Sequence, residues 1–255
     1  MHGGPPAVGE NGRAVSLAAA CSSSAFRAAP TIRGPRAPIV INHSRTPDPV
    51  IFYADASLAV IDKPAGLLAV AGRGEAGRDH LAVRVQRLIG DALVVHRLDM
   101  ATSGLMLFAR GAAMQRRLSM AFEGREVGKR YIAVVAGTPD DDEGRIDLPL
   151  GADWPNRPRQ IVDLAHGKPA LTRWKILSRD GREQQTRIEL EPITGRTHQL
   201  RVHLAAIGHP IVGDALYAPP EVAALAPRLL LHATRLALRH PESGTGLVFD
   251  SAPPF

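Results

Sequence analysis

The sequence predicts an α+β domain whose core is a mixed, largely antiparallel sheet flanked by helices and loops. Two observations support this class: strand-like runs outnumber helical ones, and several successive strand-like runs have no helix between them. The strand patterns occupy residues 50–54, 58–62, 93–98, 104–109, 130–136, 171–177 and 185–191. The helical patterns occupy residues 79–89, 112–122, 197–206 and 220–226.

The helix at 197–206 has the clearest pattern. Leu200 and Leu204 share one face, and Gly208 and Pro210 follow as residues that end a helix. The loop that follows, residues 208–214, contains tight turns.

Residues 1–47 are predicted to be a disordered extension, and residues 48–255 a single domain. Pro, Gly, Ala and Ser dominate the extension, and Glu10 is its only acidic residue. An organellar transit peptide is the alternative for an acid-poor N-terminus, although the prolines disfavour a long amphipathic helix. No linker divides the remaining residues.

Charge and composition narrow the classes of function. The net charge is +6, and lysine occurs at only four positions, so arginine supplies the basic character. Arginine binds phosphates and stacks on bases, which indicates a nucleic acid partner, whereas a high-GC genome would enrich arginine without any such partner. The single cysteine, Cys21, excludes an internal disulfide and fits a reducing, cytoplasmic compartment. No apolar run is long enough to span a membrane.

The glycines of residues 72–77 form a G-x-G-x-x-G pattern, and Asp99 follows in the position of a ribose-binding acid. This is the pattern of a dinucleotide-binding site. However, charged residues stand beside these glycines, and the strand–helix alternation stops after Asp99. A glycine loop between a strand and a helix is therefore the favoured interpretation, and a nucleotide-cofactor enzyme is the alternative.

Three segments carry candidate chemistry. A strand delivers Asp99 into a turn of small residues two positions after Arg97, although Asp99 could equally cap that turn. A second strand carries Tyr131 among aliphatic residues. The third segment, 192–204, starts a helix whose positive end suits an anion. Its Arg201 lies beside the apolar stripe, so we expect it to be partly buried and to need a carboxylate partner.

Together these segments resemble the RluA family of pseudouridine synthases, over roughly residues 50–241. The resemblance is carried by Lys63-Pro64-Ala65-Gly66, His96-Arg97-Leu98-Asp99, the strand with Lys129 and Tyr131, and Gly195-Arg196-Thr197-His198-Gln199-Leu200-Arg201. It implies the pseudouridine synthase catalytic fold, with no separate N-terminal RNA-binding module. It also implies that RNA is the partner, with no obligate protein partner.

The resemblance assigns roles to single residues. Asp99 would be the nucleophile, Arg201 its bidentate partner, and Tyr131 the residue that stacks on uracil and helps to take the C5 proton. Arg97 would fill the space left by the flipped base. RNA contacts would come from His96, Arg196, His198 and Gln199. The isomerisation needs no redox change, so neither a cofactor nor a metal is expected. Attack at C1′, attack at C6 and elimination to a glycal all stay open.

Residues 153–158 and 226–233 are similar to the branch of the family that modifies both 23S ribosomal RNA and the anticodon stem–loop of transfer RNA. The same chemistry on another structural RNA is the alternative. A catalytically silent RNA-binding protein is a further one, disfavoured by the presence of Asp99, Tyr131 and Arg201 together.

Overall fold

The computed structural model describes residues 31–33, 48–72, 74–182 and 184–255. The strands are β1 (Thr31–Arg33), β2 (Val50–Ala54), β3 (Leu58–Lys63), β4 (Ala92–Val94), β5 (Ser103–Arg110), β6 (Gly128–Ala136), β7 (Glu143–Asp147), β8 (Leu150–Ala152), β9 (Gln160–Val162), β10 (Leu171–Asp180), β11 (Gln185–Pro192), β12 (Leu231–Arg239) and β13 (Gly246–Asp250). The helices are α1 (Leu81–Leu88), α2 (Gly111–Glu123), α3 (Gln199–Ala206) and α4 (Pro220–Ala223), with a short 3-10 turn, η2 (Glu75–Gly77).

One large sheet organises the fold. Its main path runs β2-β3-β5-β12-β6-β11-β10-β7, with β4 on β5, β13 on β12 and β1 on β13, while β8 and β9 form a separate hairpin. Within the described residues, only β5–β12 and β1–β13 pair in parallel. The other strand pairs are antiparallel. The predicted α+β class with a mixed, largely antiparallel sheet is confirmed.

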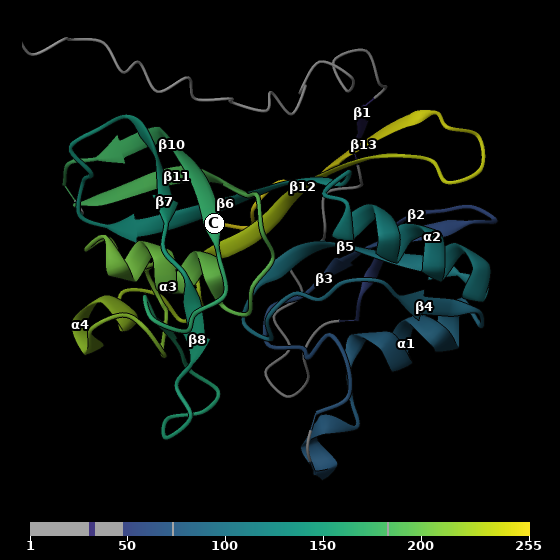
Figure 1. The fold of residues 1–255 in the computed structure, drawn as a ribbon, viewed down its shortest axis with the longest axis horizontal. Helices are drawn as coiled ribbons and strands as arrows, with labels where there is room; N and C mark the ends of the chain where they lie inside the picture. The colour runs from purple at the N-terminus through teal and green to yellow at the C-terminus, as the bar shows by residue number, and fades with distance from the viewer. Residues whose placement is uncertain (1–30, 34–47, 73, 183) are drawn as a thin grey trace, which may run out of the picture.

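Strand β12 joins two halves of the molecule (Figure 1). Helices α1 and α2 lie on the same side of β12 as β2–β5. Helices α3 and α4 lie on the other side, with β6, β7, β10 and β11. In the second half Leu200 and Leu204 of α3, which share one face of the helix as expected, form a buried cluster with Ile188 and Leu190 of β11. The region around β12 therefore brings together segments that are far apart in sequence.

Strand β4 is shorter than predicted. It ends at Val94 rather than at residue 98, because the next backbone N–H of β5 donates to the side chain of His96 and not to a backbone carbonyl. The backbone N–H of Leu107 in β5 donates to Nε2 of His96 at 2.8 Å, and Gln115 caps the Val94 carbonyl. The chain is thereby released from the sheet and turns toward Asp99.

The glycine loop before α1 does not form a dinucleotide-binding unit. Strands β3 and β4, on either side of α1, do not pair with each other: β5 lies between them and runs antiparallel to both, whereas that unit is built on neighbouring parallel strands. The glycines have a packing reason instead: a Cβ on Gly77 would lie 2.4 Å from the backbone carbon of Gly72. The nucleotide-cofactor alternative is therefore wrong.

The predicted extension, 1–47, lies outside the described residues except for Thr31–Arg33. Those three residues pair as β1 with Val248–Asp250 of β13, so predicted disorder is wrong for them. In the part of the chain that the structure describes, no helix is long and apolar enough to cross a bilayer.

Candidate active site

Asp99 lies in the turn between β4 and β5, and a buried lysine holds that turn. The ammonium of Lys63, at the end of β3, donates to the carbonyls of Pro64 (2.9 Å), Leu67 (2.8 Å) and Met100 (3.1 Å). Burial lowers the pKa of Lys63 to about 7, although the charge of Asp99 opposes this shift. Lys63 thus fixes the residue that directly follows Asp99.

A chain of buried polar groups supports the other end of the turn. Arg228 donates to the Ser103 hydroxyl at 2.6 Å, which lies 2.9 Å from Nδ1 of His232. The other nitrogen of that imidazole, Nε2, lies 3.2 Å from the Ser251 hydroxyl, which donates to Asp62 at 2.7 Å. Because arginine can only donate, each group in this chain donates a hydrogen bond to the next, from Arg228 to Asp62. Every polar group in the chain thereby has a hydrogen-bond partner.

Gly104 follows Ser103 and lies against β12. Its φ is +110°, and a Cβ at this position would lie 2.4 Å from the Ala233 carbonyl oxygen. A larger residue would separate β5 from β12 at their parallel contact, His232↔Ser103 and Ala233↔Gly104. The turn is therefore seated directly on the central strand.

Arg201 of α3 faces two carboxylates, and it forms its bidentate pair with Asp214, not with Asp99. Its Nε and Nη2 donate to Asp214 at 2.8 and 2.6 Å, whereas its Nη1 lies 3.5 Å from Oδ2 of Asp99. The expected fork on Asp99 is therefore wrong. Burial lowers the pKa of Arg201, but the hydrogen bonds to Asp214 and the nearby negative charges outweigh it and leave that pKa raised.

The two carboxylates differ in access. The Asp214 side chain is 0% exposed and the Asp99 side chain 25% exposed. Asp214 also accepts from the backbone N–H groups of Leu216 and Tyr217, so its oxygens are fully used by the protein. Only Asp99 is accessible to a substrate. The sequence placed Asp214 in a turn-rich loop without a role, although a buried Arg201 required just such a carboxylate.

His198 and Tyr217 complete this cluster. His198 stands at the start of α3 with φ +54°, a left-handed conformation that is costly for a residue with a Cβ. Its Nδ1 lies 2.6 Å from the Tyr217 hydroxyl, and its Nε2 lies 3.9 Å from Oδ2 of Asp99. No sequence pattern indicated Tyr217, whose ring also lies 5.0 Å from the guanidinium of Arg201.

Hydrogen bonding assigns the His198 tautomer. The Tyr217 hydroxyl oxygen already accepts from the backbone N–H of Gln160 at 2.8 Å, and burial raises the Tyr217 pKa, so the hydroxyl keeps its proton. That proton is donated to Nδ1 of His198. Burial lowers the pKa of His198, against the charge of Asp99, so the ring is neutral with its own proton on Nε2, directed at Asp99.

Tyr131 on β6 packs at the junction of the clusters on either side of β12. Burial raises its pKa above the ordinary value, and the charge of Asp99 raises it further. At neutral pH it is therefore a phenol, not a phenolate, so it is a poor proton acceptor. The expected part in removing the C5 proton is not supported by this environment, whereas a ring beside Asp99 suits stacking.

The residues expected to contact RNA fall into two groups. Arg97 and Arg196 are exposed, and Arg196 is steadied by donation to the Pro169 carbonyl at 3.1 Å. Gln199 is buried instead: it accepts from Thr194 and from the Arg196 backbone, and it donates to Leu171 and Thr172. Its amide braces the loop before α3 and is not available to RNA.

His96 also has a structural position. Besides accepting from Leu107, its ring stacks on Phe122 with centroids 4.4 Å apart. Burial lowers its pKa to about 3, so the ring is neutral. Its Nε2 and one face are occupied by the protein, and we assign it to the support of the turn rather than to RNA binding.

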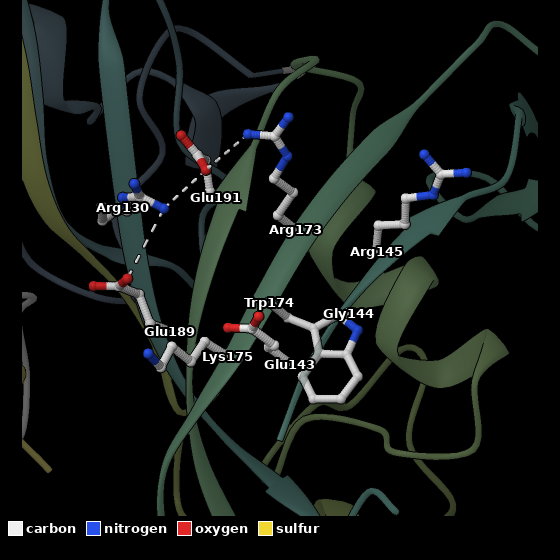
Figure 2. Close-up of a pocket in the computed structure, with 9 residues that line it drawn as sticks. All are labelled: Arg130, Glu143, Gly144, Arg145, Arg173, Trp174, Lys175, Glu189 and Glu191. Carbon is white, nitrogen blue, oxygen red and sulfur yellow. Dashed lines mark ion pairs between the residues drawn. The ribbon is translucent and has the colours of Figure 1, made fainter. Parts of the chain in front are cut away.

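A hollow of about 540 Å³ lies away from these residues, along β6, β11, β10 and β7 (Figure 2). Figure 2 shows Arg130 between Glu189 and Glu191, at 3.9 and 2.9 Å, with Arg173 on the far side of Glu191 at 3.8 Å. The acids neutralise much of the basic charge, and no predicted site residue lines this hollow. The residues around Asp99, and not this hollow, therefore form the candidate active site.

No group of three or more His, Cys, Asp or Glu side chains suited to a metal ion occurs among the described residues. The fold and the site together define an enzyme with one accessible carboxylate held between an arginine and a histidine. Comparison with known proteins then identifies the family. Residues 57–206 match the family description of RNA pseudouridylate synthase.

Individual relatives agree. The chain is 48% identical over 214 residues to the dual-specificity RNA pseudouridine synthase RluA of Escherichia coli, covering 84% of this chain and 97% of that protein. It is 46% identical over 218 residues to the protein of that name in Pasteurella multocida, covering 85% and 99%. The solved structure of human RNA pseudouridylate synthase domain containing 1 matches with a TM-score of 0.71 and 26% identity, covering 84% and 87%.

The chain therefore belongs to the RNA pseudouridylate synthase family. It is an isomerase that converts uridine to pseudouridine in RNA. The alternative of a catalytically silent RNA-binding protein is not supported, since the chain belongs to an enzyme family and its Asp99 is accessible.

Proposed function

We propose that Asp99 is the nucleophile of this isomerase. The observation that carries the proposal is the difference between the two carboxylates on Arg201: Asp214 is buried and fully hydrogen-bonded, whereas Asp99 is 25% exposed and has one guanidinium nitrogen at 3.5 Å. Arg201 places a positive charge beside Asp99 without covering it. His198 directs its Nε2 proton at the same carboxylate oxygen from 3.9 Å.

Uridine isomerisation breaks the bond between C1′ and N1, joins C1′ to C5, and exchanges the C5 proton for one on N1. Asp99 holds one fragment while uracil turns. Once released as a carboxylate, Asp99 is placed to take the C5 proton, because the buried phenol of Tyr131 is protonated. The Tyr131 ring covers the face of uracil and excludes water from the intermediate. Exposed Arg97 fills the place of the flipped base, two residues before Asp99.

The substrates in this proposal are 23S ribosomal RNA and the anticodon stem–loop of transfer RNA, and the compartment is the cytoplasm. Support comes from the relatives in Escherichia coli and Pasteurella multocida, which are named as dual-specificity RNA pseudouridine synthases. Mapping pseudouridine in both RNA classes from a strain that lacks the gene tests this assignment. Loss of sites in only one class would reduce the proposal to that class.

The nucleophile is tested with Asp99→Asn on RNA that carries tritium at C5 of uridine. Isomerisation releases the label, so release should be abolished in Asp99→Asn, while filter binding shows RNA affinity within about threefold of wild type. Asp140→Asn, which alters an exposed carboxylate in the loop after β6, is the matched control and should behave as wild type. Tritium release by Asp99→Asn would overturn the assignment.

A further inference from the structure

The turn between β8 and β9 presents an exposed tryptophan. The Trp154 side chain is 65% exposed, and the guanidinium of Arg157 lies 4.2 Å from its ring centroid. In Figure 1 the chain beyond β8 projects away from the main sheet. A large aromatic ring paired with a cation on a projecting turn is a surface suited to stacking on another planar group.

The turn is held rigid by its own hydrogen bonds. The backbone N–H of Asp153 donates to the Arg159 carbonyl at 3.0 Å, and that of Arg159 donates to the Asn156 carbonyl at 3.0 Å. The Asn156 side chain donates to both oxygens of Asp153, at 3.1 and 3.0 Å. Trp154 is thus presented in an ordered position, which reduces the entropy lost when a ligand binds.

Contacts link this turn directly to the active site. The guanidinium of Arg159 lies 5.6 Å from the ring of Tyr217, and the Gln160 backbone donates to the Tyr217 hydroxyl. The same hydroxyl bonds to His198, which faces Asp99. The turn is thus connected to Asp99 through Tyr217 and His198, which places it next to the candidate site.

We propose that Trp154, supported by Arg157, stacks on an unpaired base next to the target uridine. This inference rests on the proposed function and adds a recognition element to it. The indole ring offers a flat face to any base, and exposed Arg157 and Arg159 supply positive charge for the neighbouring phosphates. An unpaired base fits better than a duplex, because stacking on Trp154 requires a free base face.

Intrinsic fluorescence tests the contact, because the chain has only two tryptophans. In a Trp174→Phe, Asp99→Asn protein, Trp154 is the sole reporter and turnover is blocked. Titration with an RNA stem–loop that has an unpaired uridine in its loop should quench the emission, with the same midpoint as filter binding. A Trp154→Phe, Asp99→Asn protein reports from Trp174 in β10 and should show no quenching. Equal quenching of Trp154 by a fully paired duplex, or none by the stem–loop, would overturn the proposal.

Kinetics supply the second readout. Trp154→Ala should raise KM for the stem–loop by about tenfold to a hundredfold, the size of one lost base stack. The single-turnover rate at saturating RNA should stay within about twofold of wild type, and Trp154→Phe should restore most of the affinity. An unchanged KM in Trp154→Ala would refute stacking while wild type stays active, whereas an inactive wild type would refute the proposed function itself.

Discussion

Two substitutions, Asp214→Asn and Asp99→Asn, each replace one of the carboxylates beside Arg201 with an amide. Together they distinguish the carboxylate that supports the site from the one that takes part in the reaction. In Asp214→Asn the amide oxygen can stay on Nη2 of Arg201 and on the two backbone donors that Oδ1 accepts. The amide nitrogen then faces Nε of Arg201, at the position where Oδ2 of Asp214 accepts a hydrogen bond at 2.8 Å in the wild-type protein. Two donors face each other in a buried site, and Arg201 loses its fully buried counter-charge.

The loss of unfolding free energy in Asp214→Asn can be worked out from these two changes. An unsatisfied buried donor costs about 1–3 kcal/mol, and breaking a buried ion pair about 3–5 kcal/mol, so we expect about 3 kcal/mol for Asp214→Asn. For a domain of this size that is a fall in Tm of roughly 6–12 °C. Asp99→Asn should lower Tm by less than about 2 °C, because its carboxylate is partly exposed, its charged neighbour, Arg201, lies at 3.5 Å, and the neutral His198 lies at 3.9 Å.

Thermal unfolding by circular dichroism, together with single-turnover tritium release, measures both effects. We expect Asp99→Asn to be stable and inactive. Asp214→Asn should be unstable and at least about tenfold slower, because Arg201 turns toward Asp99 and covers it. If Asp214→Asn unfolds within 2 °C of wild type, or if Asp99→Asn is equally destabilised, the division of roles between the two carboxylates is incorrect.

Two more predictions concern histidines. Burial lowers the pKa of His96 and of His232 to about 3. Between about pH 6.5 and pH 3, each of these histidines is therefore protonated in the unfolded chain but not in the folded protein. The free energy of unfolding consequently falls as the pH is lowered through this range. His232→Gln should reduce the slope of unfolding free energy against pH by about 1.4 kcal/mol per unit, measured by urea denaturation at pH 4–6, and an unchanged slope would contradict this. Tyr217→Phe removes the hydroxyl that directs His198, so the single-turnover rate should fall several-fold with little change in RNA affinity; a wild-type rate would show that His198 needs no such partner.

The predicted fold class was confirmed because most strands on the main path of the sheet have strong local patterns, although β7 at its edge was not predicted. The helix at 197–206 was found as α3 through Leu200 and Leu204. Strands β12 and β13 were not predicted, although β12 lies in the middle of the sheet between β5 and β6 and β13 pairs with it. Strand β12 is central because of pairings with segments far away in sequence, and local periodicity carries no information about those.

Prediction of the site was limited for a similar physical reason. Residue patterns indicated that Arg201 would be buried and need a carboxylate, but they could not show which acid the fold would bring to it. Asp214 follows Arg201 closely in sequence, yet its selection depends on how the chain after α3 folds back. The positions of Gln199 and His96 depend in the same way on buried neighbours, and polar residue type alone favoured an RNA contact for each.

The place of β12 also affects how the protein is made. Residues 231–239 are synthesised after both β5 and β6, yet they separate these two strands and carry the contact beside the Asp99 turn. A nascent chain that has not yet released these residues from the ribosome cannot close its sheet or seat Ser103 and Gly104. Chains that have not yet been extended through β12 therefore lack the strand on which the turn carrying Asp99 is seated.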